Sequence, residues 1–239
     1  MRYIYGPVKS RRLGASLGIS LTPHKICSFN CVYCQLGRTQ NLTRERKEYL
    51  KIEEITNELK LWLANNPTQA GGLSYITISG CGEPSLHVKI GDLIQEIKKL
   101  TVVPVAVITN SSLLNDDSVR NALLSADLII PTLNTVNPGV FIKVSRPEPS
   151  IKIEEIINGL TNLSKEFRGK IWLEAMLLRG MNDDIRQIKK LKEVIDRINP
   201  DKIQLNSPVR MTAEPNVLPV GRKKLEKIKE ILGDKCEIV

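Results

Sequence analysis

A short segment with three cysteines constrains this chain more than any other feature. Cys27, Cys31 and Cys34 lie within eight residues, and the whole sequence holds five cysteines. Thiolates bind soft metal centres, and a tight loop can aim three of them at one point. Closed structural zinc sites and fully ligated iron–sulfur cubanes take four protein ligands. Three thiolates therefore favour a cubane with one corner left for a ligand that is not protein.

Other roles for these thiols remain open at the level of the sequence. A Cys-x-x-Cys pair alone also serves redox dithiols and zinc knuckles. Zinc would need a fourth ligand, and His24 is the only nearby histidine, since His87 lies far along the chain. A disulfide with one spare thiol is disfavoured in a chain without a secretory signal. The spacing and a later glycine motif favour the iron–sulfur centre over zinc.

Apolar strands alternate with amphipathic stretches, which predicts an α/β fold with a parallel sheet covered by helices. Six repeats suit an open partial barrel, in which chemistry sits at the carboxyl ends of the strands. The expected strands are 17–21, 75–79, 102–109, 127–130, 171–176 and 202–205. The expected helices are 52–64, 87–100, 116–125, 151–167, 183–199 and 222–232.

The chain has the length and composition of one globular domain. Its 239 residues are 41% hydrophobic and 26% charged, which is ordinary for a soluble protein. We expect one domain over 1–239, with a basic N-terminal arm at 1–15 and a C-terminal extension with the final helix at 206–239. No apolar run approaches membrane-spanning length, and no signal peptide opens the chain. A cytoplasmic protein with reduced thiols and no membrane partner is expected.

The surface charge favours an acidic partner. Lysine and arginine number 35 against 26 acidic residues, which gives a net charge of +9. Such a balance favours nucleic acid, although a generally lysine-rich surface gives the same count. Arg11, Arg12, Arg146 and Arg210 are the candidates for contact with an anionic substrate such as RNA.

The cysteine spacing, with Tyr33 directly before Cys34, resembles the radical S-adenosylmethionine (SAM) superfamily. Segments 5–14, 27–37 and 79–87 are further similar to a branch related to the tRNA wyosine-synthesis enzymes. The resemblance implies a partial (βα)6 barrel of the radical SAM type. It also implies that Cys27, Cys31 and Cys34 bind a 4Fe–4S cluster whose remaining iron is chelated by SAM.

A glycine-rich turn is the second motif that carries the resemblance. The segment Gly80-Cys81-Gly82-Glu83-Pro is similar to the family's Gly-Gly-Glu-Pro motif, which binds the SAM amino group. Cys81 stands where the family usually has glycine, so the backbone conformation of this turn is expected to differ locally from that of the family motif. Glu83 is expected either to accept from the amine or to hold the turn.

Polar residues at later strand ends complete the expected cofactor site. Asn110 suits hydrogen bonds to ribose or to the methionine carboxylate, and the resemblance favours Asn134 in the loop after the fourth strand. Glu174 lies within an apolar strand, where an acid is costly unless it faces a polar cavity or a cation. The expected cofactor residues are Tyr33, Gly80, Cys81, Gly82, Glu83, Asn110, Asn134 and Glu174.

The resemblance implies a reaction but not its substrate. An external one-electron donor, ferredoxin- or flavodoxin-like, would reduce the cluster. SAM would then yield methionine and a 5′-deoxyadenosyl radical that abstracts hydrogen from a substrate. RNA, a peptide or protein, and a small metabolite all remain candidates. The non-enzyme alternatives are an iron–sulfur electron carrier, which normally has a fourth thiolate, and a zinc-bearing nucleic-acid-binding module.

Overall fold

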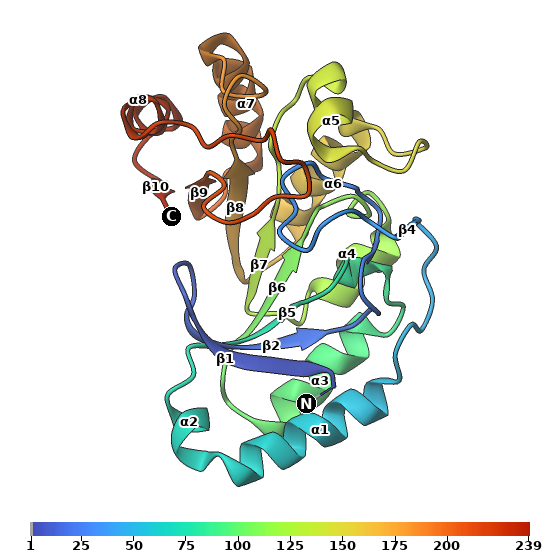
Figure 1. The fold of residues 1–239 in the computed structure, drawn as a ribbon. Coiled ribbons are helices and arrows are strands. Elements are labelled where there is room, and N and C mark those ends of the chain that lie inside the picture. The colour runs from blue at the N-terminus through green and yellow to red at the C-terminus, as the bar shows by residue number, and fades with distance from the viewer. Residues whose placement is uncertain (1) are drawn as a thin grey trace.

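The computed structural model describes residues 2–239, which form an open, curved sheet with helices on its outer side (Figure 1). The strand order is β1-β2-β5-β6-β7-β8-β9-β10. Only β1 and β2 pair antiparallel; the other neighbours are parallel. The strands are β1 (Ile4–Ser10), β2 (Gly14–Ser20), β5 (Tyr75–Ser79), β6 (Val105–Thr109), β7 (Leu128–Pro131), β8 (Lys170–Met176), β9 (Lys202–Asn206) and β10 (Cys236–Ile238).

All six expected strand–helix repeats are present, so the α/β partial barrel is confirmed. Their bounds differ from the expected ones by a few residues, because helix and strand ends depend on local caps. The helices are α1 (Ile52–Asn65), α2 (Pro67–Gly71), α3 (Ile90–Leu100), α4 (Asp117–Leu123), α5 (Pro138–Ser145), α6 (Ile153–Glu166), α7 (Ile185–Ile198) and α8 (Arg222–Leu232), with a 3-10 turn at Pro84–Leu86. None of the helices within residues 2–239 combines the length and apolar character needed to cross a membrane.

Within the segment predicted as a basic N-terminal arm, 1–15, residues Ile4–Ser10 form β1 of a hairpin. In it β1 pairs with β2, and Ile4 lies opposite Ile19 in the main core. Only the first part of β1 is buried, so its sequence lacks the regular alternation that marks a half-buried strand. The hairpin carries Arg11 and Arg12 in the turn between β1 and β2.

Among the other elements that the sequence did not predict are α5 and β10. The short helix α5 begins after Asn137, whose side-chain oxygen accepts from Val140 N at 3.0 Å. Within the predicted C-terminal extension, Cys236 opens a strand that pairs parallel with β9. Both elements are short, so their periodicity is too brief to separate from a loop.

The two faces of the sheet meet different environments, because strand side chains alternate between faces. Ile76 and Leu173 are fully buried in the main core, which the helices share. A smaller apolar cluster fills part of the inner side and contains Leu13, Ala106, Leu128 and Ile130. Polar groups also lie on that side, where the Ser16 and Thr77 hydroxyls are 2.6 Å apart. The inner side therefore combines an apolar floor with polar walls.

Two leucines of α1 provide a matched test of this core. Leu59 is fully buried, whereas Leu61 is 64% exposed. We expect Leu59→Ala to lower the free energy of unfolding by about 2–5 kcal/mol, because the cavity adds to the lost burial. Leu61→Ala should stay within about 0.5 kcal/mol of the parent chain. Urea unfolding followed by circular dichroism measures both, and equal losses would contradict this placement of α1.

Candidate active site

The three-cysteine segment lies in a long loop that leaves the carboxyl end of β2. Cys27 belongs to the short strand β3 (Ile26–Cys27), which pairs with β4 (Asn41–Leu42). Cys34 N donates to Cys31 O at 3.2 Å, which closes a turn between these two residues. Val32 N donates to Val144 O of α5 at 3.0 Å. These bonds fix the cysteine loop, residues 21–51, over the barrel mouth.

Hydrogen-bond donors surround the sulfur atoms of this loop. Lys25 Nζ lies 3.1 Å from Cys34 Sγ, and Asn110 Nδ2 lies 3.5 Å from Cys27 Sγ. Burial raises the pKa of Cys27 to about 12 and that of Cys31 further, so both free thiols stay protonated. A metal would have to displace these protons, and the surrounding donors would stabilise the resulting thiolates.

The donor set fits an iron–sulfur cubane. Three thiols from one loop share the same neighbourhood, with N–H groups directed at two of the sulfur atoms. Across residues 2–239, no three His, Cys, Asp or Glu side chains are grouped as ligands of a single metal ion. A cubane differs from such an ion because each thiolate binds a separate iron corner.

The turn at Gly80–Glu83 packs against the cysteine loop. Gly80 has φ +86°, and an added Cβ would lie 2.7 Å from Ser20 Cα. At Gly82 an added Cβ would lie 1.9 Å from the Ile26 carbonyl oxygen, so only glycine fits. The Cys81 carbonyl accepts from Lys25 N at 2.6 Å. The glycines thus serve a close approach between two protein loops.

Glu83 holds this turn in place. Its carboxylate is 2% exposed and accepts from Ser85 Oγ and Thr109 Oγ1 at 2.6 Å each. Asn110 N donates to the second oxygen at 2.7 Å. Burial raises the pKa of Glu83, while these donors oppose that shift by stabilising the anion. Of its two expected roles, the structure shows the turn-holding one, and Glu83 also orients Asn110 toward Cys27.

A second polar network joins the cysteine loop to β8. Asn134 Nδ2 donates to the Tyr33 hydroxyl at 2.7 Å, and its Oδ1 accepts from Met176 N at 2.8 Å. Glu174, buried on β8, accepts from Asn206 Nδ2 at 3.2 Å. Its carboxylate also lies 2.9 Å from Arg12 Nη1, so the expected cation partner is present.

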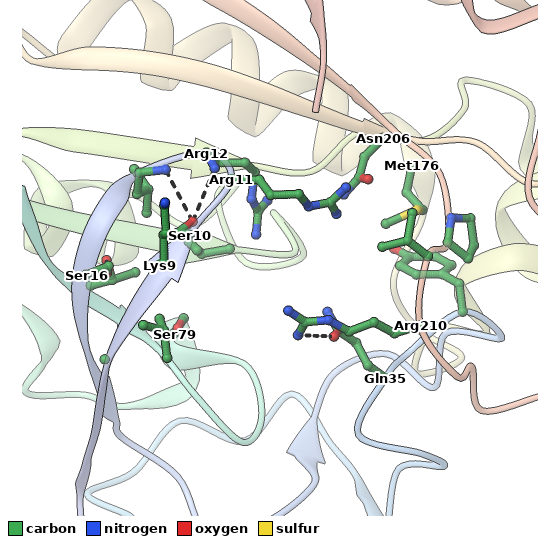
Figure 2. A pocket seen from close by; sticks show the side chains of 18 of the residues that line it. Lys9, Ser10, Arg11, Arg12, Ser16, Gln35, Ser79, Met176, Asn206 and Arg210 are labelled. Atoms are coloured by element: carbon green, nitrogen blue, oxygen red, sulfur yellow. Dashed lines mark hydrogen bonds between the residues drawn. The ribbon is translucent and has the colours of Figure 1, made fainter. Parts of the chain in front are cut away.

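A cavity of about 670 Å³ opens in the side of the barrel. Figure 2 shows Lys9, Arg11 and Arg12 on one wall and Arg210 on the opposite wall. Arg210 Nη1 donates to Gln35 Oε1 at 3.0 Å, which links this wall to the cysteine loop. None of the described residues that line the cavity is acidic. The other lining residues are Tyr5, Val8, Ser10, Leu13, Ser16, Gly18, Tyr33, Thr77, Ser79, Ile108, Met176, Asn206, Ser207, Pro208, Val209, Met211 and Thr212.

Three of the four arginines predicted to contact substrate line the cavity. Arg11, Arg12 and Arg210 line it, whereas Arg146 does not and instead lies 2.5 Å from Glu214 in an ion pair. Sequence reasoning missed Lys9, which lies near the end of β1 and lines the cavity. The sequence signal that could have indicated this hairpin is Gly14, which has φ +69° in the structure. The hairpin brings Lys9 to the cavity wall.

Comparisons with known proteins agree with this geometry. The model of the Radical SAM superfamily matches residues 21–192. A UPF0026 protein of Methanocaldococcus jannaschii is 34% identical over all of this chain and 73% of its own length. A protein of Brachyspira hyodysenteriae named GTPase Obg is 39% identical over 98% of this chain, which spans only 34% of that protein.

A solved structure has the same fold. It is a structure of TYW1 with a lysine–pyruvate adduct bound, and it superposes with a TM-score of 0.66 at 18% sequence identity. The match covers 95% of this chain and 76% of that chain. Radical SAM proteins bind a 4Fe–4S cluster and SAM, which agrees with the three thiols found here.

His87, for which the sequence showed no partner, is fully buried directly after the 3-10 turn. Its Nε2 lies 2.8 Å from Leu50 O, and its Nδ1 accepts from Lys89 N at 3.2 Å. These two partners define a neutral ring that donates through Nε2. Burial lowers the pKa of His87 below its usual value.

We therefore expect the free energy of unfolding to decrease as the pH is lowered through the range in which histidine titrates. The unfolded chain takes up a proton near pH 6.5 and the folded chain only at lower pH, so acid favours unfolding by up to about 1.4 kcal/mol per pH unit. Urea unfolding of the metal-free chain at pH 7.5 and 5.5 should show this loss. His87→Gln should reduce it, whereas the exposed His24→Gln should not. An unchanged pH dependence in His87→Gln would contradict the expectation.

Proposed function

Because the chain belongs to the radical SAM superfamily, whose members are enzymes, we propose that it cleaves SAM reductively and transfers the radical to an anionic substrate. RNA is our first candidate for that substrate. The observation that carries this proposal is the cavity with Lys9, Arg11, Arg12 and Arg210 on its walls and no described acidic lining residue. Tyr33 and Gln35 of the cysteine loop line the same cavity, so its contents would lie beside the proposed cofactor site.

In this proposal Cys27, Cys31 and Cys34 hold the 4Fe–4S cluster. When bound, the cluster would supply the one-electron reduction of SAM, with the electron drawn from an external ferredoxin- or flavodoxin-like donor, and the products would be methionine and a 5′-deoxyadenosyl radical able to abstract hydrogen. The protein supplies position and shelter rather than acid–base groups. The turn at 80–83 holds the cysteine loop in register through the Cys81 carbonyl and the Glu83 amide.

Several side chains would orient SAM and keep water away. Asn134 and Tyr33 are joined at 2.7 Å and lie between the cysteine loop and β8. Asn110, held by Glu83, places its amide beside Cys27. We propose that Glu174 contributes a polar group from the inner side of β8, where Arg12 balances its charge at 2.9 Å. The remaining proposed SAM contacts come from the backbone of Gly80, Cys81 and Gly82.

Charge and shape together support an RNA substrate. The net charge of +9 favours binding to polyanions, and three cavity cations, Lys9, Arg11 and Arg210, take part in no ion pair within residues 2–239. A single-stranded nucleotide can be splayed into a pocket, where its phosphate meets arginine. The likeness of the motif segments to tRNA wyosine-synthesis enzymes supports the same substrate class.

A small anionic metabolite is the second candidate. A volume of about 670 Å³ is in the range of small-molecule pockets, and the same cations would hold a carboxylate or phosphate. The neighbour with a lysine–pyruvate adduct shows such a small carboxylate in a protein of this fold. The two candidates differ in whether binding extends beyond the cavity rim.

The activity is tested under anaerobic conditions. We expect the chain reconstituted with iron and sulfide, reduced with dithionite and given SAM, to form 5′-deoxyadenosine and methionine, measured by chromatography. Cys34→Ala should lose both products and part of its iron. Cys236→Ala, a buried cysteine of β10 outside the site, should keep both. Binding of zinc in place of iron, with no SAM bound, would contradict the enzyme proposal and favour a zinc module.

Substrate class is tested by binding to bulk tRNA at several salt concentrations. We expect Arg11→Ala and Arg210→Ala each to weaken binding and to reduce the slope of log affinity against log salt by about 0.7, because one phosphate contact is lost. Arg186→Ala, whose side chain is 92% exposed on α7, is the matched control. Fluorescence anisotropy measures the affinity of the parent chain and of the three variants for tRNA. Equal effects of all three substitutions would favour the small metabolite.

A further inference from the structure

Lys25 is a buried cation within the cysteine loop. It is 2% exposed, and its Nζ donates to Cys34 Sγ at 3.1 Å. Its backbone is in the left-handed region, with φ +57°. Lys25 N donates to Cys81 O at 2.6 Å, and Lys25 O accepts from Gln40 N at 3.1 Å. These bonds fix the backbone of Lys25 on both sides, and its buried ammonium group is directed at Cys34 rather than at solvent.

No carboxylate in the described part of the chain forms an ion pair with Lys25. A buried ammonium group without a negative partner is costly. The Cys34 sulfur, 3.1 Å from Lys25 Nζ, is a contacting group that becomes anionic when it binds a metal. Three metal-bound thiolates would supply the missing negative charge.

We propose that Lys25 is a positioning residue that orients the Cys34 thiolate and raises the reduction potential of the cluster. The inference rests on the proposed function, because it requires a cluster on these cysteines. One electron from the external donor adds one negative charge to the cluster. A fixed positive charge in a buried setting stabilises this reduced form more than the oxidised form. An N–H···S bond acts in the same direction by withdrawing charge from sulfur.

The loop offers a matched control for this effect. Lys47 belongs to the same loop, but its side chain is 51% exposed and pairs with Glu45 at 3.0 Å. A charge in that position is screened by water and salt, so its removal should leave the cluster unaffected. Lys25→Met removes the buried charge at similar volume, and Lys25→Arg keeps the charge.

The test is a redox titration of the reconstituted full chain, followed by electron paramagnetic resonance. We expect Lys25→Met to lower the equilibrium constant for one-electron reduction about tenfold, a shift of about 59 mV to more negative potential. Lys25→Arg should restore most of the shift, and Lys47→Met should match the parent chain. Equal potentials in Lys25→Met and the parent chain, at equal iron content, would overturn the role of Lys25.

The outcomes separate this inference from the proposed function. Iron, sulfide and SAM binding are measured first on the parent chain, and failure there rejects the cluster itself. If Lys25→Met takes up no cluster, the redox titration is done with Lys25→Gln instead. The glutamine amide keeps a hydrogen-bond donor but carries no charge. Folded neutral variants that both fail to hold a cluster would overturn the inference, because Lys25 would then serve assembly rather than potential.

Discussion

The close packing of the turn at 80–83 on residues 25 and 26 is the contact on which the site depends. Lys25 N donates to Cys81 O at 2.6 Å, and Glu83 N donates to Ile26 O at 3.1 Å. Two backbones can approach this closely only because position 82 has no side chain. Two motifs more than fifty residues apart in sequence are thereby locked together. Cys27, the first cysteine, lies next to these contacts in the short strand β3, so the start of the cysteine loop is fixed.

Within residues 2–239, the cations at the side opening of the barrel are not paired with acids, whereas the cation in its interior is. Inside, Arg12 Nη1 lies 2.9 Å from Glu174, so this buried carboxylate is balanced by a cation from the hairpin. At the rim, Lys9, Arg11 and Arg210 face the cavity without acidic lining residues in the described chain. An anion entering the rim would thus meet unpaired positive charge before it meets the neutralised wall. This difference in charge depends on the hairpin, which provides Lys9 and Arg11 at the rim and Arg12 inside.

How far the sequence predicts the structure depends on how local each signal is. The six strands and their helices carry clear periodicity, and the cysteine and glycine motifs were placed at the correct strand ends. The hairpin was missed because β1 is mostly exposed. The hydrogen-bond partners of Glu83, and the role proposed for Lys25, could not be predicted from the sequence for another reason. The contacts of Glu83 include Thr109 and Asn110, and the environment of Lys25 includes Cys81, so both depend on tertiary packing.

Backbone strain points to the same region as the chemistry. Four non-glycine residues within 2–239 have positive φ, and two of them, Arg146 and Asn199, are the left-handed C-caps of α5 and α7. The other two, Lys25 and Ser111, lie within or beside the cysteine loop, and the cap residue Arg146 also contacts it. Lys25 lies within it, Arg146 O accepts from Asn30 N at 3.0 Å, and Ser111 lies between two residues that contact Ser28. Each such residue costs on the order of 1 kcal/mol or more, and persists only where the surroundings determine it. Strain gathered around one loop is the expected mark of a segment held in shape for function rather than for stability.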